Sequence, residues 1–187
     1  IMIKIALLGE SIRQIGYGPK VPSLLGDEYS VWQPNDNCRF ALYTLRGMFD
    51  WRAQLEGCDV IHWNNGLWDV CELFGDGPFT EPTYYVETML RIAGLLQKYA
   101  RRVIFATTTP VLPANAHNKN VVIADYNRII VPKLEALGIA IDDLYSIVYP
   151  KLNEYIRSDD NIHLTEAGID ACAAAVADSI RRAAAEL

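Results

Sequence analysis

The sequence IKIALLGES occupies residues 3–11, and this stretch decides the fold class. Ile3–Leu8 is an aliphatic run interrupted only by Lys4, which is typical of a strand buried on both faces. Gly9 ends the run, and Ser11 follows two residues later. In open α/β sheets, ligands bind outside the carboxyl ends of the strands. The stretch therefore predicts a buried strand that carries a serine to the functional edge of a sheet.

Further apolar runs alternate with longer amphipathic stretches along the chain. The short runs predict strands at 30–33, 59–63, 103–106 and 139–141, and the amphipathic stretches predict helices at 39–55, 83–99, 120–137 and 164–187. Thr165 is the expected N-cap of the last helix, Gly138 closes the preceding helix, and Pro132 is a potential kink within it. Strands separated by helices indicate an α/β fold with a parallel sheet covered on both faces.

Length and composition limit the classes of protein to consider. A chain of 187 residues fits one domain, and no repeat, linker or low-complexity tract divides it, so we expect a single domain over residues 1–187. The net charge of −6 argues against a nucleic-acid or anionic-membrane partner. The four cysteines have no C-x-x-C spacing, so we expect buried free thiols and no metal.

The sequence also suggests where the protein acts. No charged leader with a long apolar stretch and a cleavage site precedes the first predicted strand. No run reaches the ~18 apolar residues that a membrane span requires. We therefore expect a cytoplasmic protein.

A carboxylate and an imidazole stand three residues apart just before the last predicted helix. Asp160 and His163 can hydrogen-bond across a turn, which would fix the ring tautomer and leave the second ring nitrogen free to accept a hydroxyl proton. Ser11 is the candidate hydroxyl, and its Oγ should then lie about 2.6–3.2 Å from that nitrogen. Alternatively, Ser11 only caps a helix and the pair forms a surface turn. His62 lies in a predicted strand, which favours a packed role, and His117 lies in a polar loop, which favours exposure.

An ester hydrolase also needs donors for the oxyanion that develops during the reaction. Asn64 and Asn65 follow the strand predicted at 59–63, where their side-chain amides could donate. The alternative is a simple turn, because the Asn-Gly dipeptide that ends at Gly66 favours positive φ. Residues 35–39 follow the strand predicted at 30–33, and their backbone N–H groups, at the start of the next helix, could also donate to the oxyanion.

These segments resemble the sequence blocks of the SGNH (GDSL-type) hydrolase superfamily. The sequence LGES at 8–11 is similar to the first block, with Glu10 where Asp is usual, and Asp160 to His163 matches the Asp-x-x-His of the last block. The similarity extends over nearly the whole chain. It implies Ser11 as nucleophile, His163 as base and Asp160 as the residue that orients the base. It also implies a flavodoxin-like three-layer α/β/α sandwich with a five-stranded parallel sheet.

The two middle blocks depart from the superfamily pattern. Cys38 stands where the second block has an oxyanion-hole glycine, but its backbone N–H could serve equally. The third block is normally Gly-x-Asn-Asp, whereas residues 64–69 read NNGLWD. Alignment on the glycine puts Trp68 at the asparagine position, while alignment on the strand end brings Asn64 or Asn65 there. We favour Asn64, with Asn65 as the alternative, so the expected oxyanion donors are Ser11, Cys38 and one of these amides.

The resemblance extends to bacterial carbohydrate acetylesterases. It implies two-step acyl transfer without a cofactor or metal, on a short ester, in particular an acetyl ester of a small molecule or oligosaccharide. Arg39, Trp63 and Trp68 lie beside the expected catalytic segments and are candidates for sugar binding, although the aromatic residues could equally belong to the core. The alternatives are a lysophospholipase or thioesterase that acts on longer acyl chains, and a flavodoxin-like binding module without activity.

Overall fold

The computed structural model describes residues 2–187, which contain a five-stranded parallel sheet. The strands lie in the order β2-β1-β3-β4-β5. Their bounds are β1 Ile3–Leu8, β2 Tyr29–Trp32, β3 Cys58–Trp63, β4 Ala100–Ala106 and β5 Ala140–Asp142. In register, Leu8 of β1 lies beside Trp63 of β3, so these two strands end at the same level. The predicted α/β fold with a parallel sheet is confirmed.

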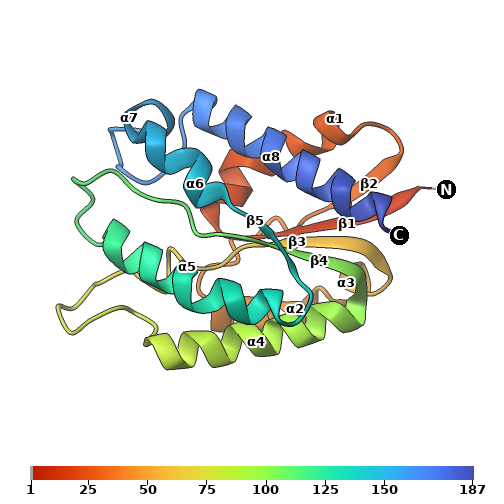
Figure 1. The fold of residues 1–187 in the computed structure, drawn as a ribbon, viewed down its shortest axis with the longest axis horizontal. Coiled ribbons are helices and arrows are strands. Elements are labelled where there is room, and N and C mark those ends of the chain that lie inside the picture. The colour runs from red at the N-terminus through yellow and green to blue at the C-terminus, as the bar shows by residue number, and fades with distance from the viewer. Residues whose placement is uncertain (1) are drawn as a thin grey trace.

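Helices cover both faces of the sheet (Figure 1). One face carries the π-helix η1 (Ile12–Tyr17), α1 (Val21–Leu25), α6 (Leu144–Val148), the 3-10 helix η2 (Tyr149–Lys151), α7 (Leu152–Tyr155) and the long α8 (Glu166–Ala185). The opposite face carries α2 (Ala41–Asp50), α3 (Arg52–Leu55), α4 (Pro82–Tyr99) and α5 (Asn120–Glu135). The three layers confirm the predicted α/β/α sandwich.

Most elements lie where the hydrophobic pattern predicts them, within one to three residues. The predicted N-cap of α8 is confirmed, since the Thr165 hydroxyl accepts from the Gly168 N–H. The helix predicted at 39–55 is divided at Trp51 into α2 and α3. The Trp51 ring folds back against Gly47, where an added Cβ would lie only 2.4 Å from the ring. The pattern missed η1, α1 and the short helices before α8, which are too short to show a period.

The crossover connections bring the functional segments to one edge. The segments after β1, β2, β3 and β4 all leave the sheet at its carboxyl end, as expected for parallel strands joined by helices. α8 contacts η1, α7 and the strands β3 to β5, so the loop before α8 reaches the end of β1. None of the helices within residues 2–187 has the length and apolarity that a bilayer span requires.

Candidate active site

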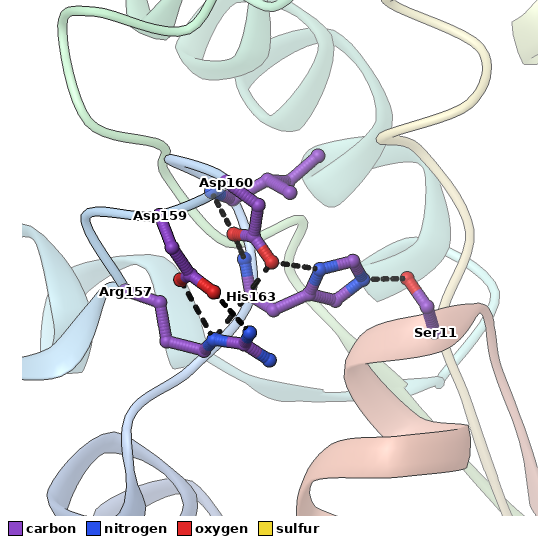
Figure 2. Close-up of polar contacts among 6 residues, drawn as sticks. Ser11, Arg157, Asp159, Asp160 and His163 are labelled. Carbon is purple, nitrogen blue, oxygen red and sulfur yellow. Dashed lines mark hydrogen bonds and ion pairs between the residues drawn. The ribbon is translucent and has the colours of Figure 1, made fainter.

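A serine, a histidine and an aspartate form one continuous hydrogen-bonded chain at the carboxyl edge of the sheet (Figure 2). Ser11 lies at the start of η1, while Asp160 and His163 lie in the loop between α7 and α8. The His163 Nε2 lies 2.9 Å from the Ser11 Oγ, and its Nδ1 lies 2.9 Å from the Asp160 Oδ2. The first distance falls within the range expected from the sequence. The arrangement can pass a proton from the hydroxyl to the imidazole.

The loop that carries the histidine is held by its own backbone. Ile156 and Leu164 form an antiparallel bridge, and the Arg157 N–H donates to the His163 carbonyl at 2.8 Å. At the turn, Asn161 has a φ of 64°, in the left-handed region that asparagine tolerates. This closed loop presents the histidine ring toward Ser11 (Figure 2).

Asp160 is built to stay ionised. Its Oδ1 accepts the N–H groups of Ile162 at 3.0 Å and His163 at 2.9 Å, while its Oδ2 contacts the ring. Partial burial raises its pKa, but these two N–H groups and the imidazole more than offset that effect and hold the pKa at about 2. An ionised carboxylate favours the tautomer with its proton on Nδ1. The Nε2 that faces Ser11 is then a free acceptor.

The turn at residues 9–11, which carries Ser11 and is called the nucleophile turn below, depends on glycine at position 9. A Cβ on Gly9 would lie 2.8 Å from the Cβ of Arg13, so no larger side chain fits without displacement. Ser11 occupies the N-cap of η1, but its hydroxyl makes no capping bond and meets His163 instead. The backbone N–H of Ser11 lies at a helix start, where N–H groups lack intrahelical partners. The turn thus presents both a hydroxyl and a backbone donor.

The two asparagines after β3 have different surroundings. The Asn64 amide donates to the Ala106 carbonyl at 2.9 Å, which uses one of its two N–H groups, and 5% of the residue is exposed. Asn65 is fully buried: its Oδ1 accepts the Trp63 indole N–H, and its amide donates to the Arg39 carbonyl at 2.8 Å. Asn65 therefore joins the end of β3 to the loop before α2.

Cys38 does not offer the free donor that we expected. Its backbone N–H donates to the Gly9 carbonyl at 3.2 Å, its Sγ accepts the Gly9 N–H at 3.3 Å, and the residue is fully buried. The paired contacts hold the loop before α2 against the nucleophile turn. The expectation of an available N–H at this position is corrected, because the interaction with Gly9 already uses it.

The three predicted substrate contacts differ in accessibility. Trp63 is fully buried and packs edge-on against Phe105 at 5.0 Å between ring centroids, so the prediction that it contacts substrate is wrong. As the last residue of β3, it still lies within the layer of core side chains. Trp68 is 39% exposed, and Arg39 is also exposed, with its guanidinium 4.8 Å from the Tyr43 ring centroid. Both side chains are accessible.

Two buried acids lie under the site, and the sequence pattern gave no role to either. The Glu10 Oε1 accepts the Leu67 N–H at 3.3 Å, and burial raises the pKa of Glu10 to about 8 despite this bond. Asp69 accepts from the Ala41 N–H at the start of α2 and from the Thr80 hydroxyl, and burial raises its pKa to about 7. Glu10 thus joins the segment after β3 to the turn after β1, and Asp69 joins the same segment to the start of α2.

A small apolar pocket adjoins the serine and histidine. Its volume is about 60 Å³, well below the ~300–1,000 Å³ that is typical of pockets for drug-sized ligands. The lining consists of Ser11, Ile12, Ile15, Gly16, Arg157, His163, Leu164 and Ile169. A group that enters this pocket must be short.

The remaining histidines lie apart from this chain of hydrogen bonds. His62 is fully buried, and its Nε2 lies 2.9 Å from the Oδ2 of the buried Asp142. It therefore has the packed role that its strand position suggests. His117 is exposed, and its Nδ1 lies 3.0 Å from the Glu72 carbonyl.

The fold matches solved structures, although neither a family model nor a curated protein sequence matches the chain. The acetyl xylan esterase AlAXEase superposes with a TM-score of 0.76 at 20% identity, over 97% of this chain and 99% of that one. A member of the lipolytic G-D-S-L family from Veillonella parvula gives a TM-score of 0.78 at 13% identity, over 96% and 99%. Axe2, an acetylxylan esterase from Geobacillus stearothermophilus, gives 0.77 at 16% identity, over 95% and 94%. The chain thus has the fold of SGNH hydrolases.

Proposed function

We propose that this chain is a serine ester hydrolase that removes short acyl groups, in particular acetyl, from a carbohydrate. The observation that carries the proposal is the unbroken hydrogen-bonded chain from the Ser11 hydroxyl through His163 to Asp160. It lies in the fold of acetyl xylan esterases and of a lipolytic G-D-S-L protein, at the edge of the sheet where α/β folds bind ligands.

The proposed reaction proceeds in two acyl-transfer steps. The His163 Nε2 takes the Ser11 proton as Oγ attacks the ester carbonyl carbon, which moves an electron pair onto the carbonyl oxygen. The imidazolium then protonates the leaving alcohol, and an acyl-enzyme remains on Ser11. Water attacks this ester while His163 accepts its proton. Collapse of the second intermediate breaks the bond to the Ser11 Oγ, which takes the proton back from His163, and the acid is released. Asp160 holds the ring and stabilises its positive charge.

The oxyanion requires donors, and two groups suit this role best. The Ser11 backbone N–H lies at a helix start, and the Asn64 amide has a second N–H beyond the one that binds the Ala106 carbonyl. Asn65 is less suited, because its carbonyl and amide are both engaged in the buried interior. We therefore assign Ser11 and Asn64 as oxyanion donors.

The size of the pocket beside Ser11 supports a short acyl group. About 60 Å³ between isoleucine and leucine side chains accepts a methyl group more readily than a long acyl chain. Arg39 and Trp68 remain accessible for the alcohol portion of the substrate, and an indole face suits a sugar ring. Two of the similar structures are acetyl xylan esterases, which supports the same substrate class.

Hydrolysis of nitrophenyl esters from acetate to octanoate tests the proposal. We expect kcat/KM to be highest for acetate and to fall with each added pair of methylenes, and Ser11→Ala to abolish turnover of all of them. Release of acetate from acetylated xylo-oligosaccharides tests the carbohydrate portion. A preference for octanoate would favour a lysophospholipase or thioesterase. Absence of turnover with every ester would contradict the proposal.

A further inference from the structure

Arg13, two residues after the serine, is a fully buried cation. Only 1% of the residue is exposed. Its Nη2 donates to the Gly9 carbonyl at 3.0 Å and to the Asp36 carbonyl at 2.6 Å, and its Nη1 donates to the Pro34 carbonyl at 2.9 Å. Further contacts reach the Gly9 carbonyl through Nε at 3.3 Å and the Gln33 Oε1 through Nη1 at 3.3 Å. Backbone carbonyls thus provide most of the partners of this side chain.

Within residues 2–187, no ion pair neutralises the positive charge of Arg13. Among residues 2–187, no carboxylate lies within ion-pair distance of its guanidinium, and the nearby Glu10 has a pKa raised by burial to about 8, so it is neutral at pH 7. Burial of an ion costs several kcal/mol unless it is paired or fully hydrogen-bonded. A hydrophobic side chain would avoid this cost. Hydrogen bonds to carbonyl groups offset this cost, and they tie the guanidinium to the segments that provide those carbonyls.

The guanidinium joins two segments of the proposed site. Gly9 belongs to the nucleophile turn, whereas Pro34 and Asp36 belong to the loop that precedes α2. Since a trans peptide directs its N–H opposite to its C=O, each carbonyl that faces Arg13 also fixes the direction of the following N–H. A single side chain thus fixes the peptide planes on both sides of this junction.

The charge also acts on the neighbouring groups. The Cys38 Sγ lies 4.0 Å from the Arg13 Nη2. Burial raises the pKa of the Cys38 thiol, and the negative charge of Asp36 adds to the increase, whereas the positive charge of Arg13 opposes it more strongly than Asp36 supports it. A positive charge at this position also favours a negative oxyanion on the substrate.

We propose that Arg13 is the positioning residue of the nucleophile turn, whose Ser11 N–H is one of the proposed oxyanion donors. It locks the loop before α2 onto the nucleophile turn and provides an unpaired positive charge that favours the oxyanion. This role rests on the proposed esterase function. Arg13 does not touch the reacting atoms, and it acts through the backbone of residues 9–11 and 34–38.

Arg13→Ala with small-molecule rescue tests both parts of the assignment. We expect kcat for nitrophenyl acetate to fall about 10²-fold, as for other ~1 Å displacements of catalytic groups, with KM nearly unchanged. Millimolar guanidinium ion should enter the space left by the side chain and restore part of kcat. Urea has a similar shape and donors but no charge, so it should not restore kcat. Arg128→Gln is the control, since Arg128 is exposed and pairs only with Asp125.

The possible results separate this assignment from the proposed function. Wild-type kcat in a folded Arg13→Ala, or equal rescue by urea and guanidinium, overturns the assignment while the esterase proposal stands. A wild-type protein without activity refutes the esterase proposal itself. If circular dichroism shows that Arg13→Ala is unfolded, Arg13→Lys takes its place, because it keeps the charge but loses the fork of donors. Reduced kcat at an unchanged Tm then supports the role, and wild-type kcat overturns it.

Discussion

Replacement of Asp160 by asparagine isolates the contribution of the carboxylate to the proposed mechanism. The change preserves size and leaves one oxygen to accept the N–H groups of Ile162 and His163, which hold the turn. It replaces the oxygen 2.9 Å from the His163 Nδ1 by an amide nitrogen. That nitrogen donates, so the ring must present a bare Nδ1 and carry its proton on Nε2. No base then remains for Ser11.

The expected loss follows from this exchange of tautomers. The same substitution in a serine protease triad lowers kcat about 10⁴-fold. Here 31% of the Asp160 side chain is exposed, so water can partly replace the carboxylate. We therefore expect kcat to fall about 10²–10⁴-fold, which corresponds to about 3–5 kcal/mol of transition-state stabilisation. KM should change little, because Asp160 does not face the small pocket beside Ser11.

Steady-state hydrolysis of nitrophenyl acetate, with thermal unfolding in parallel, measures this loss. Asp178→Asn is the matched control, because the exposed Asp178 lies on α8 away from the site and pairs with Arg181 on the surface. The control should keep wild-type kcat. A kcat for Asp160→Asn within threefold of the control, at equal stability, would refute the assignment of Asp160 as the residue that orients the base.

Three further predictions concern the surroundings of the site. Because the pKa of Glu10 rises from 4.5 unfolded to about 8 folded, its contribution to stability is complete below pH 4.5 and is lost as the pH rises toward 8. Urea unfolding should show this decline, at about 1.4 kcal/mol per unit of pKa shift. Glu10→Gln should reduce the decline and leave the part that Asp69 causes, since burial raises the pKa of Asp69 from 3.8 to about 7. Asn64→Ala should lower kcat about 10²–10³-fold. Asn65→Ala should mainly reduce the free energy of unfolding, by about 1–3 kcal/mol. If both variants changed kcat and stability equally, the assignment of Asn64 over Asn65 as oxyanion donor would be refuted. Gly66→Ala should destabilise the protein by about 1–3 kcal/mol in thermal unfolding, since its Cβ would lie 1.8 Å from the Thr108 Oγ1, and a wild-type Tm would contradict the close packing.

Hydrophobic periodicity predicted the fold because it depends on which residues are buried. β1 is found at its predicted bounds, whereas β4 begins three residues early, at Ala100. Arg101 and Arg102 open that strand with exposed side chains, so the apolar pattern does not include them. The π-helix after Ser11 was missed for a related reason, since it has only six residues and non-helical dihedrals at Gly16.

The site was predictable where its chemistry is local in sequence. Asp160 and His163 are three residues apart, so their contact follows from the turn, and Ser11 follows from the strand end. The prediction for Trp63 failed because its burial depends on packing against β4, which its own segment does not specify.

Interactions with the backbone leave no signal in the sequence. Arg13 was missed because arginine is seldom fully buried, and its partners are carbonyl groups. The free donor expected at Cys38 was wrong for the same reason, since a carbonyl two segments away accepts its N–H.

Labelling by a fluorophosphonate tests the central claim most directly, because the reagent reacts only with a serine that a neighbouring base has activated. We predict that the wild-type protein gains one phosphonyl group at Ser11, that Ser11→Ala gains none, and that His163→Ala is labelled far more slowly. Intact-protein and peptide mass spectrometry would locate the adduct. Equal labelling of the wild-type protein and Ser11→Ala, or no labelling of a folded wild-type protein, would contradict the assignment of Ser11 as nucleophile.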